Sequence, residues 1–168
     1  MQQLLSPYIT ETAIDGTGMH IGIIVARFNS HITGAMLELA HAELTRLGVS
    51  SEGIDVISVP GSYELATTAQ AMLANKHYDA LICFGCIMKG ETRHDVLVGD
   101  AAAHGIQRVA LDTGVPIIFG VICAETQQQA SERIERGTEC AHSAVELACT
   151  IRNLKGVKGV KTGAFAHN

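Results

Sequence analysis

The segment Gly85-Cys-Ile-Met-Lys-Gly-Glu-Thr-Arg-His94 combines groups that can hold a phosphate and move a proton. Gly90 allows the backbone to approach a ligand closely, and the N–H groups of Glu91 and Thr92 are predicted to open a helix. Free N–H groups at the positive end of a helix dipole bind anions, and the Thr92 hydroxyl adds a donor. His94, one turn into that helix, is placed to exchange protons with a ligand. An ordinary threonine cap beside a solvated histidine is the structural alternative.

The segment Val59-Pro-Gly-Ser-Tyr-Glu64 is predicted to start another helix directly after a strand. Ser62 can cap that helix, and Glu64 stands in its first turn, where the dipole favours a carboxylate. This structural explanation suffices for both side chains, although either can also accept hydrogen bonds from a ligand.

Aromatic residues are scarce, with four phenylalanines and three tyrosines in 168 residues. Phe28 follows the first predicted strand, Tyr63 follows the second, and Phe119 lies in the fourth. Rings gathered at one rim of a sheet form a stacking surface for a flat heterocycle. Burial in the core is an equally good interpretation of these three side chains.

Two arginines, Arg133 and Arg136, are predicted to lie in a break before the last helix. A guanidinium can grip phosphate with two parallel hydrogen bonds, but most surface arginines are solvated or form weak ion pairs. The residues alone do not decide between these roles.

A C-x-x-C spacing, Cys83-Phe-Gly-Cys86, raises the question of a metal or redox site. Zinc needs further ligands at suitable spacing, which Cys123, Cys140 and Cys149 do not supply. A redox pair favours a helix N-terminus, whereas Cys83 lies inside an apolar run. We therefore interpret the pair as buried or strand-end cysteines, with no metal site. An odd number of cysteines in apolar segments is typical of reduced thiols in a cytoplasmic protein.

The elements that must position these groups follow from the apolar pattern. Near-continuous Val- and Ile-rich runs predict parallel strands covered on both faces. The runs are His20–Val25, Ile54–Ser58, Ala80–Phe84 and Pro116–Ile122. Helical spacing of apolar residues predicts helices over about 32–47, 65–73, 97–113 and 125–154. Gly48 and Gly114 are predicted to end the first and third helices, and Gly137 to divide the last.

This alternation predicts one α/β domain over residues 1–168, a flavodoxin-like three-layer sandwich with a four-stranded parallel sheet and helices on both faces. The core would span about 18–154, with mobile or extended tails at 1–17 and 155–168, the N-terminal segment adding a strand to a neighbouring subunit. An apolar last helix, with Ala141, Ala144, Val145 and Ala148, suits either a subunit contact or burial in its own chain. Ligands bind outside the carboxyl ends of the strands in such sheets.

Composition argues against other classes of protein. The net charge is −5 without a basic block, which argues against a nucleic-acid partner. No apolar run approaches the ~20 residues that a membrane span needs. Residues Met1–Thr12 lack the basic start and apolar core of a secretory signal. A soluble cytoplasmic protein is the expectation.

Four segments stand in an order that resembles the motifs of the 6,7-dimethyl-8-ribityllumazine synthase family over about residues 18–154. They are Ala26-Arg-Phe-Asn29, Val59-Pro-Gly-Ser-Tyr-Glu64, Gly85-Cys-Ile-Met-Lys-Gly-Glu-Thr-Arg-His94 and Pro116-Ile-Ile-Phe-Gly120. The resemblance implies a transferase that condenses 5-amino-6-(D-ribitylamino)uracil with 3,4-dihydroxy-2-butanone 4-phosphate, the penultimate step of riboflavin biosynthesis. It implies small-molecule substrates and no cofactor.

The resemblance also implies a role for each matched residue. Phe28 would stack on the pyrimidine, and His94 would transfer protons. The residues implied to contact the pyrimidine and its ribityl chain are Ser62, Tyr63, Glu64, Cys86, Ile87 and Met88. The residues implied to bind phosphate are Glu91, Thr92 and Arg133. Phe119 and Arg133 would come from the adjacent subunit of a homo-oligomer, a pentamer, a decamer or an icosahedral shell of sixty subunits.

One region departs from the commonest bacterial pattern. The loop after Arg133 is shorter, and Glu135-Arg-Gly137 stands where Asn-Lys-Gly is usual, so Arg136 is a further candidate for phosphate. Short versions resemble archaeal members. Two alternatives remain: an archaeal-type riboflavin synthase, against which the Gly-Glu-Thr-x-His run argues, and a flavin- or lumazine-binding module without turnover.

Overall fold

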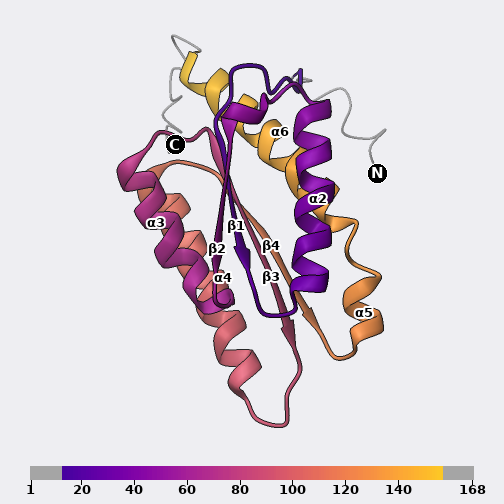
Figure 1. The fold of residues 1–168 in the computed structure, drawn as a ribbon. Helices are drawn as coiled ribbons and strands as arrows, with labels where there is room; N and C mark the ends of the chain where they lie inside the picture. Colours follow the sequence, from indigo (N-terminus) through magenta and orange to yellow (C-terminus); the bar gives the residue numbers. More distant parts are fainter. Residues whose placement is uncertain (1–12, 157–168) are drawn as a thin grey trace, which may run out of the picture.

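The computed structural model describes residues 13–156, which form three layers around a parallel sheet (Figure 1). The sheet has four strands in the order β2-β1-β3-β4. Their bounds are β1 Ile21–Ala26, β2 Ile54–Val59, β3 Ala80–Met88 and β4 Ile117–Ala124. The predicted flavodoxin-like sandwich is confirmed.

Helices cover both faces of the sheet. Helices α2 (Ser30–Arg46) and α6 (Arg136–Gly156) lie on one face, and α3 (Leu65–Asn75) and α4 (His94–Thr113) on the other (Figure 1). The smaller helical segments are η2 Ser51–Gly53, η3 Ser62–Glu64 and α5 Gln127–Ser131. Gly48 (φ 95°) and Gly114 (φ 70°) follow α2 and α4 in the left-handed conformation, which confirms both predicted helix ends.

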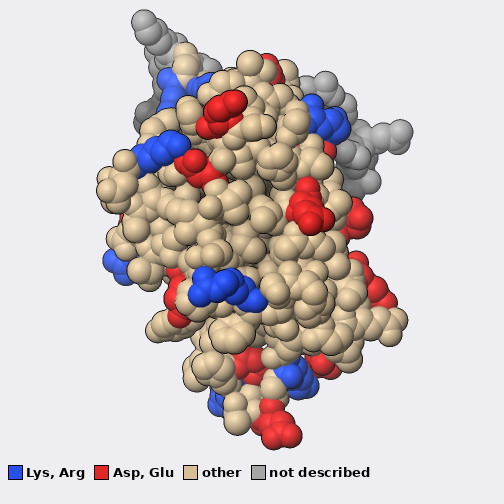
Figure 2. Space-filling view, viewed as in Figure 1, with Lys and Arg blue, Asp and Glu red and all other residues tan. Residues whose placement is uncertain are grey.

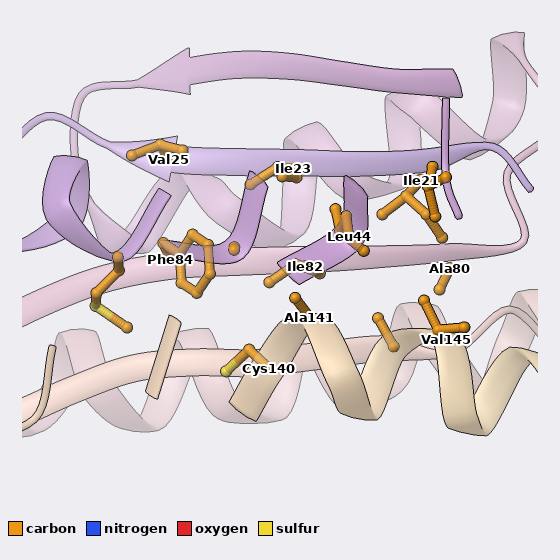
Figure 3. Packing of buried hydrophobic residues seen from close by; sticks show 14 of the residues in the cluster. Ile21, Ile23, Val25, Leu44, Ala80, Ile82, Phe84, Cys140, Ala141 and Val145 are labelled. Carbon is orange, nitrogen blue, oxygen red and sulfur yellow. The ribbon is translucent and has the colours of Figure 1, made fainter. Parts of the chain in front are cut away.

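Two apolar clusters, one on each face of the sheet, hold the layers together. On the α2/α6 face, strand residues such as Ile23 and Phe84 meet Leu44 and Val145 (Figure 3). On the opposite face, Leu81 belongs to the cluster that packs with α3 and α4. Central strands buried on both sides need apolar residues at successive positions, which explains their near-continuous Val and Ile content. The apolar residues of α6 are buried in their own chain: Ala141, Ala144, Val145 and Ala148.

Strand β2 differs from the prediction that every strand is covered on both faces. It stands at the edge of the sheet, and Val56, Ile57 and Ser58 in its middle are exposed. Only β1 pairs with it among residues 13–156. An edge strand keeps one row of backbone groups free for another partner, so its apolar composition does not guarantee burial.

The third strand is longer than the apolar run indicated. The prediction ended it at Phe84, but β3 continues to Met88 because Gly85–Met88 pair with Val121–Ala124 of β4. Strand β4 likewise runs beyond its predicted end, to Ala124. Backbone pairing with a neighbouring strand, rather than local composition, sets both ends.

The break before the last helix also lies elsewhere than predicted. Helix α5 ends at Ser131 and α6 begins at Arg136, so Gly137 is the second residue of α6 and divides nothing. A Cβ at Gly137 would overlap the carbonyl oxygen of Met36 and lie 2.8 Å from its Cα. This glycine therefore allows α2 and α6 to pack closely.

The chain approaches the first strand along the end of α2. Gly16 N–H donates to the carbonyl of Leu47 at 2.8 Å, and Ile14 packs against the larger core cluster. The predicted N-terminal strand and most of the predicted tails concern residues 1–12 and 157–168, outside the described range. Within residues 13–156, no helix is long and apolar enough to cross a membrane.

Candidate functional site

A pocket of about 890 Å³ opens at the carboxyl ends of the strands. Its walls come from the segments after β1 and β2, from the end of β3 and the loop after it, and from the first turns of α4. The lining residues that the sequence predicted are Phe28, Ser62, Tyr63, Glu64, Cys86, Ile87, Met88, Thr92 and His94. This location agrees with the general position of ligands in open α/β sheets.

Two aromatic rings are directed into this pocket instead of the core. Arg27 N–H donates to Val59 C=O at 2.8 Å and Phe28 N–H to Pro60 C=O at 3.1 Å, so the β1–β2 pairing continues beyond both strands. It places the Phe28 ring over Gly61, where a Cβ would lie only 2.9 Å from the ring. Phe28 is 69% exposed and Tyr63 is 65% exposed, which overturns the core alternative for both. They offer free apolar surface for stacking.

The start of helix α3 is built differently from the prediction. It opens with the short η3 turn, and Gly61, not Ser62, stands at the cap position. The Glu64 carboxylate accepts a hydrogen bond from Gly61 N–H at 2.9 Å, as expected for a carboxylate in a first turn. Ser62 is buried against β3, and Gly85 must lack a side chain because a Cβ there would overlap Ser62 Oγ. Ser62 therefore does not cap the helix but packs against β3 and forms part of the pocket wall.

The end of β3 extends past β1 along the pocket. Its pairing with β1 stops at Phe84, whereas its pairing with β4 continues to Met88. The Cys86 carbonyl faces the β1 side, where it accepts from Asn29, and Lys89 N–H faces the β4 side, where it donates to Ala124. Because alternate residues of a strand direct backbone groups to the same side, Met88 presents its N–H and C=O towards the pocket.

The glycine-containing loop after β3 also lines the pocket. Helix α4 begins at His94, so Glu91 and Thr92 precede the helix and do not open it, and His94 is its first residue rather than one turn in. Arg93, not Thr92, stands at the N-cap of α4 and makes no side-chain cap bond, so the ordinary threonine cap is not formed. Thr92 Oγ1 accepts from His94 N–H only at a long 3.4 Å. At Gly90 a Cβ would meet only Thr92 N, at 4.0 Å, so protein packing does not require this glycine.

Some predicted residues do not reach the pocket within this single chain. Glu91 is exposed on the same loop but is not part of the lining. Phe119 stands in β4 beside Cys83 and is 37% exposed. Arg133 lies in the turn between α5 and α6, where its Nη1 donates to Gln129 C=O at 2.7 Å, and Arg136 is the exposed first residue of α6 rather than part of the break.

Other lining residues were not predicted as part of the site. They are Asn29, Gly61, Asp95, Leu97, Val98 and Ala101. Asn29 and Gly61 stand inside the segments that resemble the family motifs. Gly90, which the sequence predicted to let the backbone approach a ligand, also lines the pocket. Leu97 begins the third helix predicted from apolar spacing, yet its side chain is 64% exposed and lines the pocket. An acidic residue beside His94, Asp95, is the one signal that could have extended the prediction along α4.

The C-x-x-C cysteines are buried strand residues, as the sequence predicted. Cys83 and Cys86 are three positions apart in β3 and belong to clusters on opposite faces of the sheet. Burial raises the pKa of the Cys83 thiol to about 12. Burial, and then the nearby Cys123, raises the pKa of Cys86. Both thiols are protonated at neutral pH, and their opposite directions preclude a disulfide between them.

Comparison with known proteins identifies relatives that cover most of the chain. Residues 18–152 match the family model described as 6,7-dimethyl-8-ribityllumazine synthase. A protein of that name from Cupriavidus necator is 41% identical over 147 residues, 87% of this chain and 89% of the relative. Its counterpart in Verminephrobacter eiseniae is 44% identical over 140 residues, 83% of this chain and 91% of the relative. The Acidovorax protein is 43% identical over 146 residues, 86% of this chain and 95% of the relative.

Proposed function

The chain belongs to the 6,7-dimethyl-8-ribityllumazine synthase family, and from this premise we propose how its pocket divides the work of that reaction. The reaction condenses 5-amino-6-(D-ribitylamino)uracil with 3,4-dihydroxy-2-butanone 4-phosphate. It yields 6,7-dimethyl-8-ribityllumazine, phosphate and water, and it is the penultimate step of riboflavin biosynthesis. The observation that carries the proposal is one pocket lined by both an exposed aromatic ring and the Gly90–His94 loop.

The pyrimidine occupies the half of the pocket between Phe28 and the end of β3. The exposed Phe28 ring stacks on the heterocycle. The N–H and C=O of Met88, on the side of β3 away from β4, match the alternating donors and acceptors of a uracil edge, and Cys86 and Ile87 complete this wall. The residues that face the ribityl hydroxyls are Ser62, Tyr63 and Glu64.

The phosphate occupies the other half, at the loop before α4. Thr92 supplies a hydroxyl, and the N–H groups of Glu91 and Thr92 lie just ahead of the positive end of the α4 dipole. On the face shown in Figure 2, basic and acidic side chains are interspersed. We assign the phosphate ester to the local donors of this loop and to one or two arginines. Arg133 is the first candidate and Arg136 is the second.

His94 serves the steps in which protons move, because it lines the pocket beside the phosphate loop. The substrate amine attacks the ketone and loses water to form an imine. Phosphate then leaves, the resulting enol tautomerises, and the second amine closes the ring with loss of another water. The reaction sequence loses two molecules of water and one phosphate in total, and it needs no oxidant or reductant. Holding the two reactants together contributes about 7–11 kcal/mol to lowering the barrier, and acid–base help adds roughly 10²–10⁴-fold.

The single chain supports an active site shared between subunits. Phe119 and Arg133 lie outside the pocket of their own chain, and both are exposed. A cyclic homo-oligomer repeats one contact between two different faces, so each chain can give both residues to the next chain's pocket. We assign a pentamer as the basic ring. Free thiols among the described residues fit a reducing cytoplasm.

One assay separates the three functions that the sequence left open. Mixing the pure protein with both proposed substrates is expected to produce lumazine fluorescence. A riboflavin synthase would instead consume added lumazine and form riboflavin. A binding module would bind lumazine or flavin without product formation. Absence of lumazine from both substrates, with folded protein, would refute the proposed function.

Thr92→Ala is expected to weaken phosphate binding about tenfold or more, because a hydrogen bond to a charged group is lost. Binding of the pyrimidine substrate should change less than twofold. Calorimetric titration with inorganic phosphate, butanone phosphate and the pyrimidine measures all three affinities. Thr113→Ala is the matched control, since its hydroxyl donates to Val109 C=O at the far end of α4. Equal losses for both substrates would show that this loop is not the phosphate site.

A further inference from the structure

Asn29 has an unusual conformation at the pocket. It is the only non-glycine residue with a positive φ in the described range, at φ 58° and ψ 44°. It stands at the N-cap of α2, where asparagine normally accepts a hydrogen bond from the first turn, but its side chain makes no such bond. Its Nδ2 donates instead to the carbonyl of Cys86 at 2.8 Å.

This contact joins two walls of the pocket. The Asn29 carbonyl accepts from Ile32 N–H at 2.9 Å and Thr33 N–H at 3.2 Å, which fixes the residue to α2. Its carboxamide reaches across to the part of β3 that has no β1 partner. Phe28, directly before it, contacts Gly61 on its other side. The left-handed turn, which asparagine tolerates better than most residues, therefore determines where the exposed ring stands relative to the β3 edge.

We propose that Asn29 is a positioning residue that holds the Phe28 ring and the free edge of β3 at the separation the pyrimidine needs. The proposal rests on the proposed function for the identity of the ligand. The hydrogen bond replaces the missing β1 partner at Cys86, so this half of the pocket is formed before the ligand arrives. Preformed sites bind more tightly because less ordering remains to be done on binding.

Two variants of Asn29 remove its hydrogen bond to the Cys86 carbonyl in different ways. Asn29→Gly accepts the left-handed conformation without strain but lacks the carboxamide. Asn29→Asp keeps the shape but sets a carboxylate oxygen against the Cys86 carbonyl. Each is expected to raise the KM for the pyrimidine roughly tenfold, the size of one lost buried hydrogen bond, with the KM for butanone phosphate changed less than twofold. Asn75→Asp is the matched control, because Asn75 also donates to a backbone carbonyl, Ala71, but at the end of α3.

A second measurement needs no substrate. The chain contains no tryptophan, so Phe28→Trp introduces a single reporter at the ring position. Adding Asn29→Asp or Asn29→Gly to this background is expected to lower the fluorescence anisotropy, whereas adding Asn75→Asp should leave it unchanged. If the native protein made no lumazine but the anisotropy still fell, the proposed function would fail and the positioning role would stand. Unchanged anisotropy with a pyrimidine KM within twofold, or equal rises in both KM values, would overturn the positioning role.

Discussion

His94→Ala is expected to lower kcat by about 10²–10⁴-fold while leaving measurable turnover. The side chain lines the pocket as the first residue of α4, so its loss removes proton transfer but not the site that brings the reactants together. Steady-state formation of lumazine at saturating substrates measures the effect. His104→Ala is the control, because His104 is exposed on the same helix and lies outside the pocket lining. A folded His94→Ala protein with the native rate, or with no turnover at all, would contradict the proposal that His94 transfers protons while the rest of the pocket brings the reactants together.

The same variant tests whether the site is shared. His94→Ala and Arg133→Ala chains, each nearly inactive alone, are unfolded together in equal amounts and reassembled. Each site would need native His94 from one chain and native Arg133 from its neighbour, and each condition is met in half of the chains. About a quarter of the sites should therefore recover, which the rate per subunit measures. No recovery in confirmed mixed rings would mean that both residues serve one chain's pocket.

Gly137→Ala is expected to destabilise the fold by about 3 kcal/mol, the upper end for an overpacked core. The added Cβ would meet backbone atoms of Met36, including its Cα at 2.8 Å, and backbone cannot move aside as a flexible side chain can. Chemical denaturation gives the free energy of unfolding, and the melting temperature should fall by roughly 6–12 °C.

Gly34→Ala in α2 is the matched control for that result. A Cβ at Gly34 would meet nothing within 4 Å, so alanine should add about 0.5–1 kcal/mol of helix stability. Equal destabilisation by the two substitutions would mean that close approach of α2 and α6 is not the reason for Gly137. Equal stability of Gly137→Ala and the native chain would lead to the same conclusion.

The order of elements could be predicted from local pattern because each signal lies within one short segment. Strand β1 is apolar at successive positions because both faces of the sheet are covered. Gly114 follows the end of α4 because the left-handed backbone conformation there favours glycine. The ends of strands were harder to predict where backbone pairing with a neighbouring strand determines them. Met88 is the last residue of β3 because Ala124 stands opposite, and nothing within residues 85–88 alone indicates this.

The candidate site divides in the same way. Phe28, Thr92 and His94 could be selected from their chemistry and their positions after strands, and all three line the pocket. Asn29 was passed over because its partner, Cys86, lies 57 residues away in the chain. Leu97 was used only to place a helix, because helical periodicity indicates which residues share a face and not what that face contacts.

By itself, the sequence determined the class of fold, the family and the segments that form the pocket, because these depend on residue types at short spacings. Only the tertiary structure decided that the Phe28 ring is exposed over Gly61, that β3 extends past β1, and that Gly137 serves helix packing. It also decided that Arg133 lies outside its own chain's pocket. Each of these depends on distances between segments remote in the chain, which are set by how strands pair and helices pack and not by local preference.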